Sequence, residues 1–210
     1  MKATVLAGIV VGVLTTVPTA FPEAQGDAPF GNDKVTILGT ALNMSNTATG
    51  ANQTIRINID RWSTPSQREH LITTFLEKKQ DGLLKELDKQ PVMGRFNFPG
   101  YMGPDPNNTM RLGTDIHYAR NFAGEDGGRR IVIITPRIIG FREEVNNPRT
   151  TDYPFSVFEM RFDGAGNGQG KLAYGTKIMF DKKKNNVEIE NYGTEPVRLA
   201  NFVFEKGLKK

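Results

Sequence analysis

The stretch from Tyr153 to Phe204 decides the fold. Gly, Pro and Asn clusters separate four runs of aromatic and β-branched residues: FSVFEMRF (155–162), LAYGTKIMF (172–180), VEIENY (187–192) and VRLANFVF (197–204). Short runs this close together favour antiparallel strands joined as a meander, because a parallel crossover needs a dozen or more residues between strands. We therefore expect four neighbouring strands of one antiparallel sheet.

Three further runs predict strands upstream. Residues 35–42 are mainly apolar and β-branched, and in residues 54–60 three isoleucines alternate with polar residues, which is typical of a strand buried on one face. Arg130 to Thr135 contains four consecutive aliphatic residues, so we expect it to be the most buried strand of the sheet. Pro136 then ends this strand or forms a bulge.

A pair of helices is predicted after residues 54–60. Thr64, Pro65 and Gln67 match an N-cap, a first helical position and the partner in a capping box. Apolar residues then recur at helical spacing before and after Asp81 and Gly82, where we expect a break. These signals predict one helical hairpin over about 64–89, which would cover one face or one opening of the sheet.

Together these elements define one mainly β (α+β) domain at residues 34–206, followed by a short tail at 207–210. An early strand, a helical pair and then many meandering strands are the order found in small lipid-binding barrels. A calycin-like barrel is therefore the closure that we expect. An open sheet or a sandwich with the helices on one face is the alternative that the sequence leaves open.

The N-terminus has the parts of a secretory signal peptide at residues 1–20. Lys2 precedes an apolar run from Ala3 to Val17, and small residues follow up to Ala20 or Ala24, where we expect cleavage. The apolar run is too short to favour a membrane span, although a retained N-terminal anchor is the alternative. We predict a periplasmic or secreted bacterial protein with a mobile lead-in at 21–33 and no transmembrane domain after cleavage.

The composition excludes several kinds of chemistry. The 210 residues contain no cysteine, so disulfides, thiol catalysis and cysteine-ligated metals are ruled out. Basic residues exceed acidic ones by four, but the two kinds are interspersed, which does not predict a nucleic-acid partner. No metal or cofactor is predicted either: Asp163 to Gly170 begins like a calcium loop but lacks the terminal Glu, and a glycine-rich hairpin explains it.

Asp115 and His117 are the candidate catalytic residues. We expect a strand over 111–120 in which both share one face, with Ile116 and Tyr118 on the opposite face. An aspartate and a histidine two residues apart on one strand could form an oriented acid–base pair. They could equally be two polar residues on the solvent-exposed face of a half-buried strand.

Arg137, Glu159, Arg161 and Tyr174 are the candidate ligand-binding residues. Glu159 and Arg161 alternate with three apolar residues, so they share the opposite face of their strand. They would form either a buried ion pair inside a cavity, which would mark a site, or a cross-strand pair on the surface.

Three motifs resemble those of an uncharacterised family of small bacterial proteins that carry signal peptides. They are Asp-Tyr-Pro-Phe at 152–155, Gly-Lys-Leu at 170–172 and Glu-Asn-Tyr-Gly-Thr-Glu-Pro-Val-Arg-Leu at 190–199. The similarity spans roughly residues 54–204. It implies an exported protein with a single domain; because the family has no assigned activity, no site residues follow from it.

The sequence favours a non-enzymatic binding module that takes a small, partly apolar or amphipathic ligand into the mouth of the barrel. Strands with aliphatic and aromatic residues on both faces motivate this hypothesis. Two alternatives stay open. One is an envelope-associated structural or interaction protein that works through its surface; the other, less favoured, is a hydrolase or isomerase that uses Asp115 and His117.

Overall fold

The computed structural model describes residues 34–44, 52–101, 112–124, 127–137, 155–174, 178–181, 186–189 and 197–205. For Tyr174 and for residues 178–181 and 186–189 the description covers the backbone. The predicted signal peptide, the lead-in at 21–33 and the tail at 207–210 lie outside the described residues.

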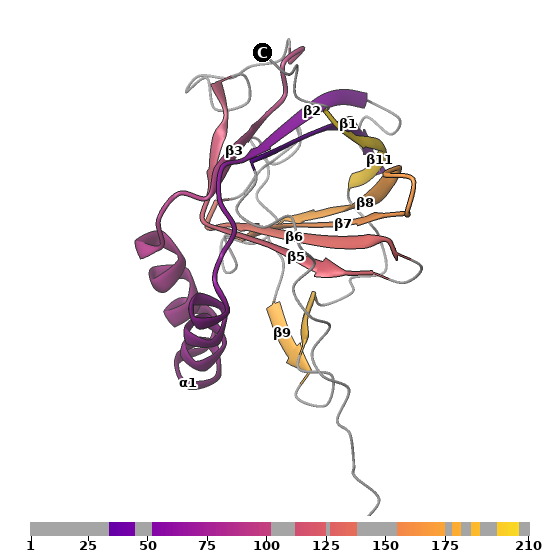
Figure 1. Ribbon diagram of the computed structural model, residues 1–210. Coiled ribbons are helices and arrows are strands. Elements are labelled where there is room, and N and C mark those ends of the chain that lie inside the picture. Colours follow the sequence, from indigo (N-terminus) through magenta and orange to yellow (C-terminus); the bar gives the residue numbers. More distant parts are fainter. Residues whose placement is uncertain are drawn as a thin grey trace, which may run out of the picture.

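Nine strands form one antiparallel sheet that curls into a nearly closed barrel (Figure 1). Their order around the barrel is β4-β3-β2-β1-β11-β8-β7-β6-β5. The strands are β1 (Val35–Asn43), β2 (Asn52–Ile59), β3 (Gly94–Asn97), β4 (Thr114–Ile116), β5 (Tyr118–Ala123), β6 (Arg129–Thr135), β7 (Ser156–Phe162), β8 (Gly168–Tyr174) and β11 (Val197–Phe204). The predicted mainly β class and its barrel closure are confirmed.

The barrel closes through one bent stretch of chain. β4 pairs with β3, β5 pairs with β6, and His117 alone separates β4 from β5, so the two ends of the sheet meet there. The N–H of His117 donates to the carbonyl of Ile134 at 3.3 Å. The prediction of one continuous strand over 111–120 is wrong, because the bend at His117 shifts the alternation. Ile116 lies inside the barrel, whereas Tyr118 lies outside it, among residues of the helix.

The barrel interior is filled by side chains from around the whole sheet. Its largest fully buried members are Phe96, Phe98, Phe158, Phe202, Ile37, Ile55, Ile57, Ile59, Met93 and Ile116. Strands β3 and β7 lie on opposite sides of the barrel, yet the ring centroids of Phe96 and Phe158 are only 4.9 Å apart. The alternation in residues 54–60 is confirmed, since its three isoleucines all face this core.

Two glycines make room for these rings. Gly39 on β1 faces Phe202, and a Cβ at residue 39 would collide with the Cδ1 and Cε1 atoms of that ring. Gly168 on β8 stands in the same relation to the ring of Phe162 and the Cβ of Phe202. A glycine in a strand lets other atoms approach its backbone closely. The rings therefore occupy space that a side chain at residue 39 or 168 would fill.

Helix α1 (Pro65–Lys89) consists of two halves that meet at Lys79, where φ is 58°. His70 Nε2 lies 3.0 Å from Glu86 Oε1. In a straight helix these residues would be separated by about 24 Å along the axis, so the two halves must fold back on each other. The predicted helical hairpin is confirmed, with its break at Lys79 rather than at residues 81–82.

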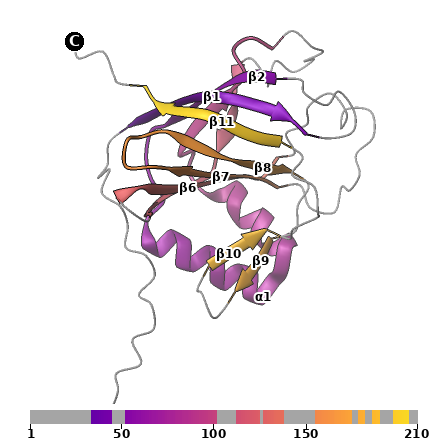
Figure 2. The same cartoon turned by 90° about the vertical axis from the view of Figure 1, so that its right-hand side faces the viewer.

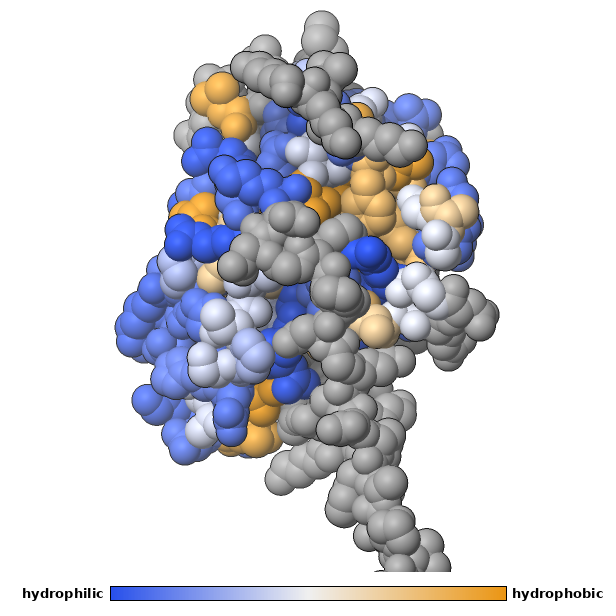
Figure 3. Space-filling view, in the orientation of Figure 1, coloured by the Kyte–Doolittle hydropathy of each residue, from blue (hydrophilic) through white to orange (hydrophobic). Residues whose placement is uncertain are grey.

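The hairpin covers the outside of β5, β6 and β7. It begins at Thr64, whose side chain accepts a hydrogen bond from the N–H of Gln67, as the capping box predicts. Its apolar side forms a second core with the barrel, made of Leu71, Leu83, Leu87, Tyr118, Val132, Ile134, Phe155 and Val157. The surface that α1 presents to solvent is mainly hydrophilic (Figure 3). No helix in the described part of the chain combines the length and the apolar character needed to cross a lipid bilayer.

Strands β9 (Ile178–Asp181) and β10 (Asn186–Ile189) form a separate antiparallel pair. Figures 1 and 2 both show this pair on the same side of β5–β8 as α1. The predicted meander is correct for the pair β7–β8 and for the pair β9–β10, but it is wrong for β11, which pairs with β8 and not with β10. Because β11 pairs with the free edge of β8, no edge of β8 is left for β9, and the run at 172–180 is divided.

Candidate functional site

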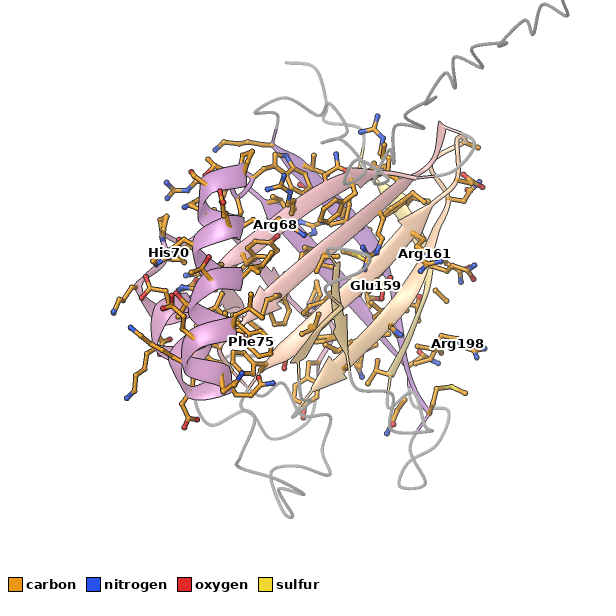
Figure 4. All side chains as sticks on the ribbon, turned by 90° about the horizontal axis from the view of Figure 1, so that it is seen from below. Arg68, His70, Phe75, Glu159, Arg161 and Arg198 are labelled. Atoms are coloured by element: carbon orange, nitrogen blue, oxygen red, sulfur yellow. The ribbon has the colours of Figure 1, made fainter. Side chains whose placement is uncertain are left out.

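Five basic side chains gather on the outer side of the barrel, next to the area that α1 covers. We call them the basic face: Arg120 on β5, Arg130 on β6, Arg161 on β7, Lys171 on β8 and Arg198 on β11. The strand register places them in two rows that run across the sheet. The first row is Arg198, Lys171, Glu159, Val132 and Arg120; the second is Gln169, Arg161, Arg130 and Phe122. Figure 4 shows Glu159, Arg161 and Arg198 on the part of the sheet away from α1.

Accessibility differs across the basic face. Arg120 is buried at its inner border, whereas the side chains of Arg130, Lys171 and Arg161 are 19%, 34% and 73% exposed. The guanidinium carbons of Arg120 and Arg130 each lie 5.6 Å from the centre of the Phe122 ring, which stabilises both cations. Arg198 is also exposed, so a ligand that approaches from solvent would meet Arg161 and Arg198 first and then Lys171.

Glu159 is the middle residue of the first row, and its carboxylate contacts cations of both rows. Its Oε1 accepts from Arg130 Nε at 2.9 Å and from Arg161 Nη2 at 3.2 Å, and its Oε2 lies 3.9 Å from Lys171 Nζ. Burial alone would raise the pKa of Glu159, but the charge and hydrogen bond of Arg130, with help from Arg161 and Lys171, lower it overall. Glu159 is therefore ionised at neutral pH, and these six charged residues carry a net charge of +4.

The surface alternative for Glu159 and Arg161 is the one that the structure adopts. Both point outward, while Phe158, Met160 and Phe162 on the same strand lie in the interior core. Arg161 is opposite Arg130 and Glu159 is opposite Lys171, so the pair belongs to a network that spans three strands. An ion pair inside a barrel cavity does not form.

Asp115 and His117 have separate partners among the described residues. Asp115 Oδ1 accepts from Arg95 Nε at 2.9 Å and from Arg95 Nη2 at 2.7 Å, as part of a cross-strand ion pair. The Nδ1 of His117 lies 3.1 Å from the carbonyl oxygen of Gln90, just beyond the end of α1. This arrangement ties β3 to β4 and the helical hairpin to the barrel, and it does not form the acid–base pair that the sequence allows.

Arg137 and Tyr174 lie near Ser156, at the end of β7 that is remote from Arg161. The Ser156 hydroxyl donates to the carbonyl of Arg137 at 2.7 Å, and the backbone of Ser156 pairs with that of Tyr174. Five residues of extended strand, about 16 Å, separate Ser156 from Arg161. The structure thus brings Glu159 and Arg161 together but does not bring Arg137 to them, and the side chain of Tyr174 lies outside the description.

Asp163, at the start of the glycine-rich turn, is engaged within that turn. Its Oδ1 accepts from the N–H groups of Asn167 at 2.8 Å and of Ala165 at 2.9 Å. These bonds, led by those from Asn167, lower the pKa of Asp163. In the part of the chain that the structure describes, no group of His, Asp and Glu side chains is arranged to hold a metal ion.

Sequence reasoning finds Glu159 and Arg161 but misses the rest of the basic face. In the sequence, Arg120, Arg130, Lys171 and Arg198 look like isolated solvated cations, because they lie on different strands. One signal could have pointed to them. Each follows or precedes a buried residue such as Leu172 or Leu199, which places the cation on the outward face of its strand.

The resemblance of three motifs to those of a bacterial family stays a prediction from the sequence. No protein-family model, no curated protein and no solved structure matches this chain.

Proposed function

We propose that this chain is an exported, non-enzymatic binding protein of the periplasm or the extracellular space, and that it binds through the outer surface of its barrel. The filled interior is the observation that carries this proposal. Rings from opposite walls meet there, and a pocket for a small molecule needs a concave space that these side chains occupy. The filled interior therefore favours a surface site over the ligand in the barrel mouth that the sequence suggests.

Two further observations support the proposal. Lys2 and the apolar run from Ala3 to Val17 favour export, and an exported protein meets polymers and surfaces rather than cytoplasmic metabolites. Asp115 and His117, the candidate catalytic residues, are each engaged in a structural contact. The basic face, by contrast, concentrates charge on one side of the barrel.

Export and surface binding can be tested on the protein purified gently from the periplasm or the medium of its own host. We expect a mature N-terminus near residues 20–24, a native mass without a stoichiometric small molecule, and sedimentation together with isolated cell envelopes. An apolar molecule retained at one per chain and released by denaturing extraction would overturn the proposal and restore a site in the interior. Recovery of the uncleaved chain from the cytosol would refute export.

A further inference from the structure

We infer that α1 is a detachable cover, which leaves the barrel and unfolds as one unit while the barrel stays closed. Its opening uncovers an apolar strip on and next to β5, β6 and β7, which consists of Tyr118, Val132, Ile134, Phe155 and Val157. The inference goes beyond the proposed function, because it concerns how two parts of the fold are joined and requires neither export nor a ligand.

The barrel and α1 are stabilised by two separate cores. Within the described part of the chain, the interior core of the barrel contains no side chain of α1. The apolar side chains that α1 buries all belong to the second core, and they are Leu71, Leu83 and Leu87. Figure 4 shows Phe75, which is partly buried, on the side of α1 that faces the sheet. Because burial of apolar surface is the dominant favourable contribution to folding, the barrel keeps its main stabilisation when the second core is lost.

Hydrogen bonds fix the chain to the barrel just before α1 begins and just after it ends. The carbonyl of Met93 accepts from the N–H groups of Asp60 at 2.8 Å and of Arg61 at 3.1 Å. The N–H of Ser63 donates to the carbonyl of Ala119 at 2.7 Å, and the hydroxyl of Ser63 accepts from the N–H of Ala119 at 3.1 Å. α1 is thus an insertion whose two ends are held together at its base, so the strands keep their pairing when α1 leaves.

α1 depends on the barrel for its helical structure. Each half is shorter than about 15 residues, a length at which an isolated helix is marginal in water. The first half contains three consecutive β-branched residues, Ile72, Thr73 and Thr74, which lower its helix propensity. At Lys79, φ is 58° and ψ is −153°, a strained conformation for a residue other than glycine, and opening releases this strain. The hairpin should therefore unfold once it leaves the barrel.

The two halves of α1 are joined to each other, so they open together. His70 Nε2, on the first half, lies 3.0 Å from Glu86 Oε1, on the second. Both halves also contribute to the same second core, since Leu71 comes from the first half and Leu83 and Leu87 come from the second. If either half left the barrel alone, it would expose the leucines of the other, which makes the opening cooperative.

Native-state hydrogen exchange of the purified protein, measured by mass spectrometry in urea below the unfolding midpoint, tests whether α1 opens first. We expect the central amides of both halves of α1 to exchange at least about 30-fold faster than those of β2 and β6. Their exchange should also depend less steeply on urea, because the opening exposes less surface than global unfolding does. Equal protection and equal urea dependence in α1 and the barrel would overturn the inference.

Two variants separate the barrel from its cover. Ile57→Val, in the interior core, should speed exchange in β2 and β6 about fivefold and leave exchange in α1 within about twofold, because the barrel stays folded when α1 opens. Leu87→Ala, in the second core, should speed exchange in α1 at least about 30-fold. If Ile57→Val speeds exchange in α1 and in the barrel equally, the chain unfolds as one cooperative unit and the inference is refuted.

Engineered cysteines report which surface the opening uncovers, since the chain has no cysteine of its own. Ile133 and Ile134 are neighbours on β6, and Ile133 belongs to the interior core whereas Ile134 belongs to the second core with α1. In variants shown to be folded by thermal unfolding, Ile134→Cys should react with iodoacetamide at least about 30-fold faster than Ile133→Cys. Equal reaction rates would mean that α1 does not uncover the apolar strip and would overturn the inference.

Discussion

Replacing Gly39 by alanine tests whether the barrel interior is as full as its side chains indicate. The added methyl group would occupy the place of two ring atoms of Phe202. The ring has little room to retreat, since Phe202 is fully buried and its Cβ already abuts the position where Gly168 lacks a side chain. Gly39→Ala should therefore strain the core instead of filling an empty space.

The magnitude follows from known costs of overpacking and of cavities. Gly39→Ala should lower the free energy of unfolding by about 2 kcal/mol, within the range measured for extra methylene groups in packed cores. Phe202→Ala should cost about 4 kcal/mol through its cavity. In the double variant the methyl group enters the space that the ring has vacated, so the total should stay near 4 kcal/mol rather than reach about 6.

Urea unfolding of the four proteins, followed by tryptophan fluorescence, measures this coupling. The chain has a single tryptophan, and Trp62 is partly buried against the interior core, so its signal reports on the barrel. Gly100→Ala is the matched control, because a Cβ at residue 100 meets no atom within 4 Å and should change stability by less than about 0.5 kcal/mol. If the costs of Gly39→Ala and Phe202→Ala are simply additive, the ring does not pack against Gly39 and the argument for a filled interior fails.

Three further predictions concern the helix and the charge network. Thr64→Ala removes the acceptor for the N–H of Gln67 and should cost about 1 kcal/mol in thermal unfolding, whereas Thr64→Ser should be nearly neutral; equal losses would contradict the cap. Lys79 has φ 58° and ψ −153°, a region that suits glycine, so Lys79→Gly should raise the free energy of unfolding by about 1 kcal/mol and Lys79→Ala should not. Although burial raises the pKa of Glu159, Arg130 and its neighbours hold it below the ordinary value of 4.5, so the unfolded chain binds this proton more readily. The stability that Glu159 contributes should be complete above about pH 4.5 and be lost as the pH falls through the lower folded pKa, and an equally steep loss in Glu159→Gln, measured by urea midpoints across this window, would contradict the prediction.

Local patterns account for much of the fold. The alternation at residues 54–60 identifies β2 and the side of it that faces the core. The sequence Thr64-Pro65-Ser66-Gln67 marks the start of α1, because capping depends on residues within one turn of the chain. The aliphatic run at 131–134 identifies a strand that is covered on both faces, by the interior on one side and by α1 on the other.

Local sequence patterns predict only part of the candidate site. Period two shows that Glu159 and Arg161 share a face, and it shows the same for each cation on its own strand. It does not show which strands are neighbours. Arg198 and Lys171 lie opposite each other only because β11 pairs with β8, and Arg130 meets Arg161 only because β6 pairs with β7.

Sequence patterns alone are enough to predict the β class, the helical hairpin and the faces on which β2 and β7 carry their apolar residues, because these features depend on contacts within a few residues. The tertiary structure alone decided the bend at His117, the exclusion of β9 and β10 from the barrel and the gathering of the basic face. The physical reason is closure. In a nearly closed barrel, every strand between the two ends of the sheet pairs with two neighbours. Which strands become neighbours depends on the packing of the whole sheet rather than on any one stretch of the chain.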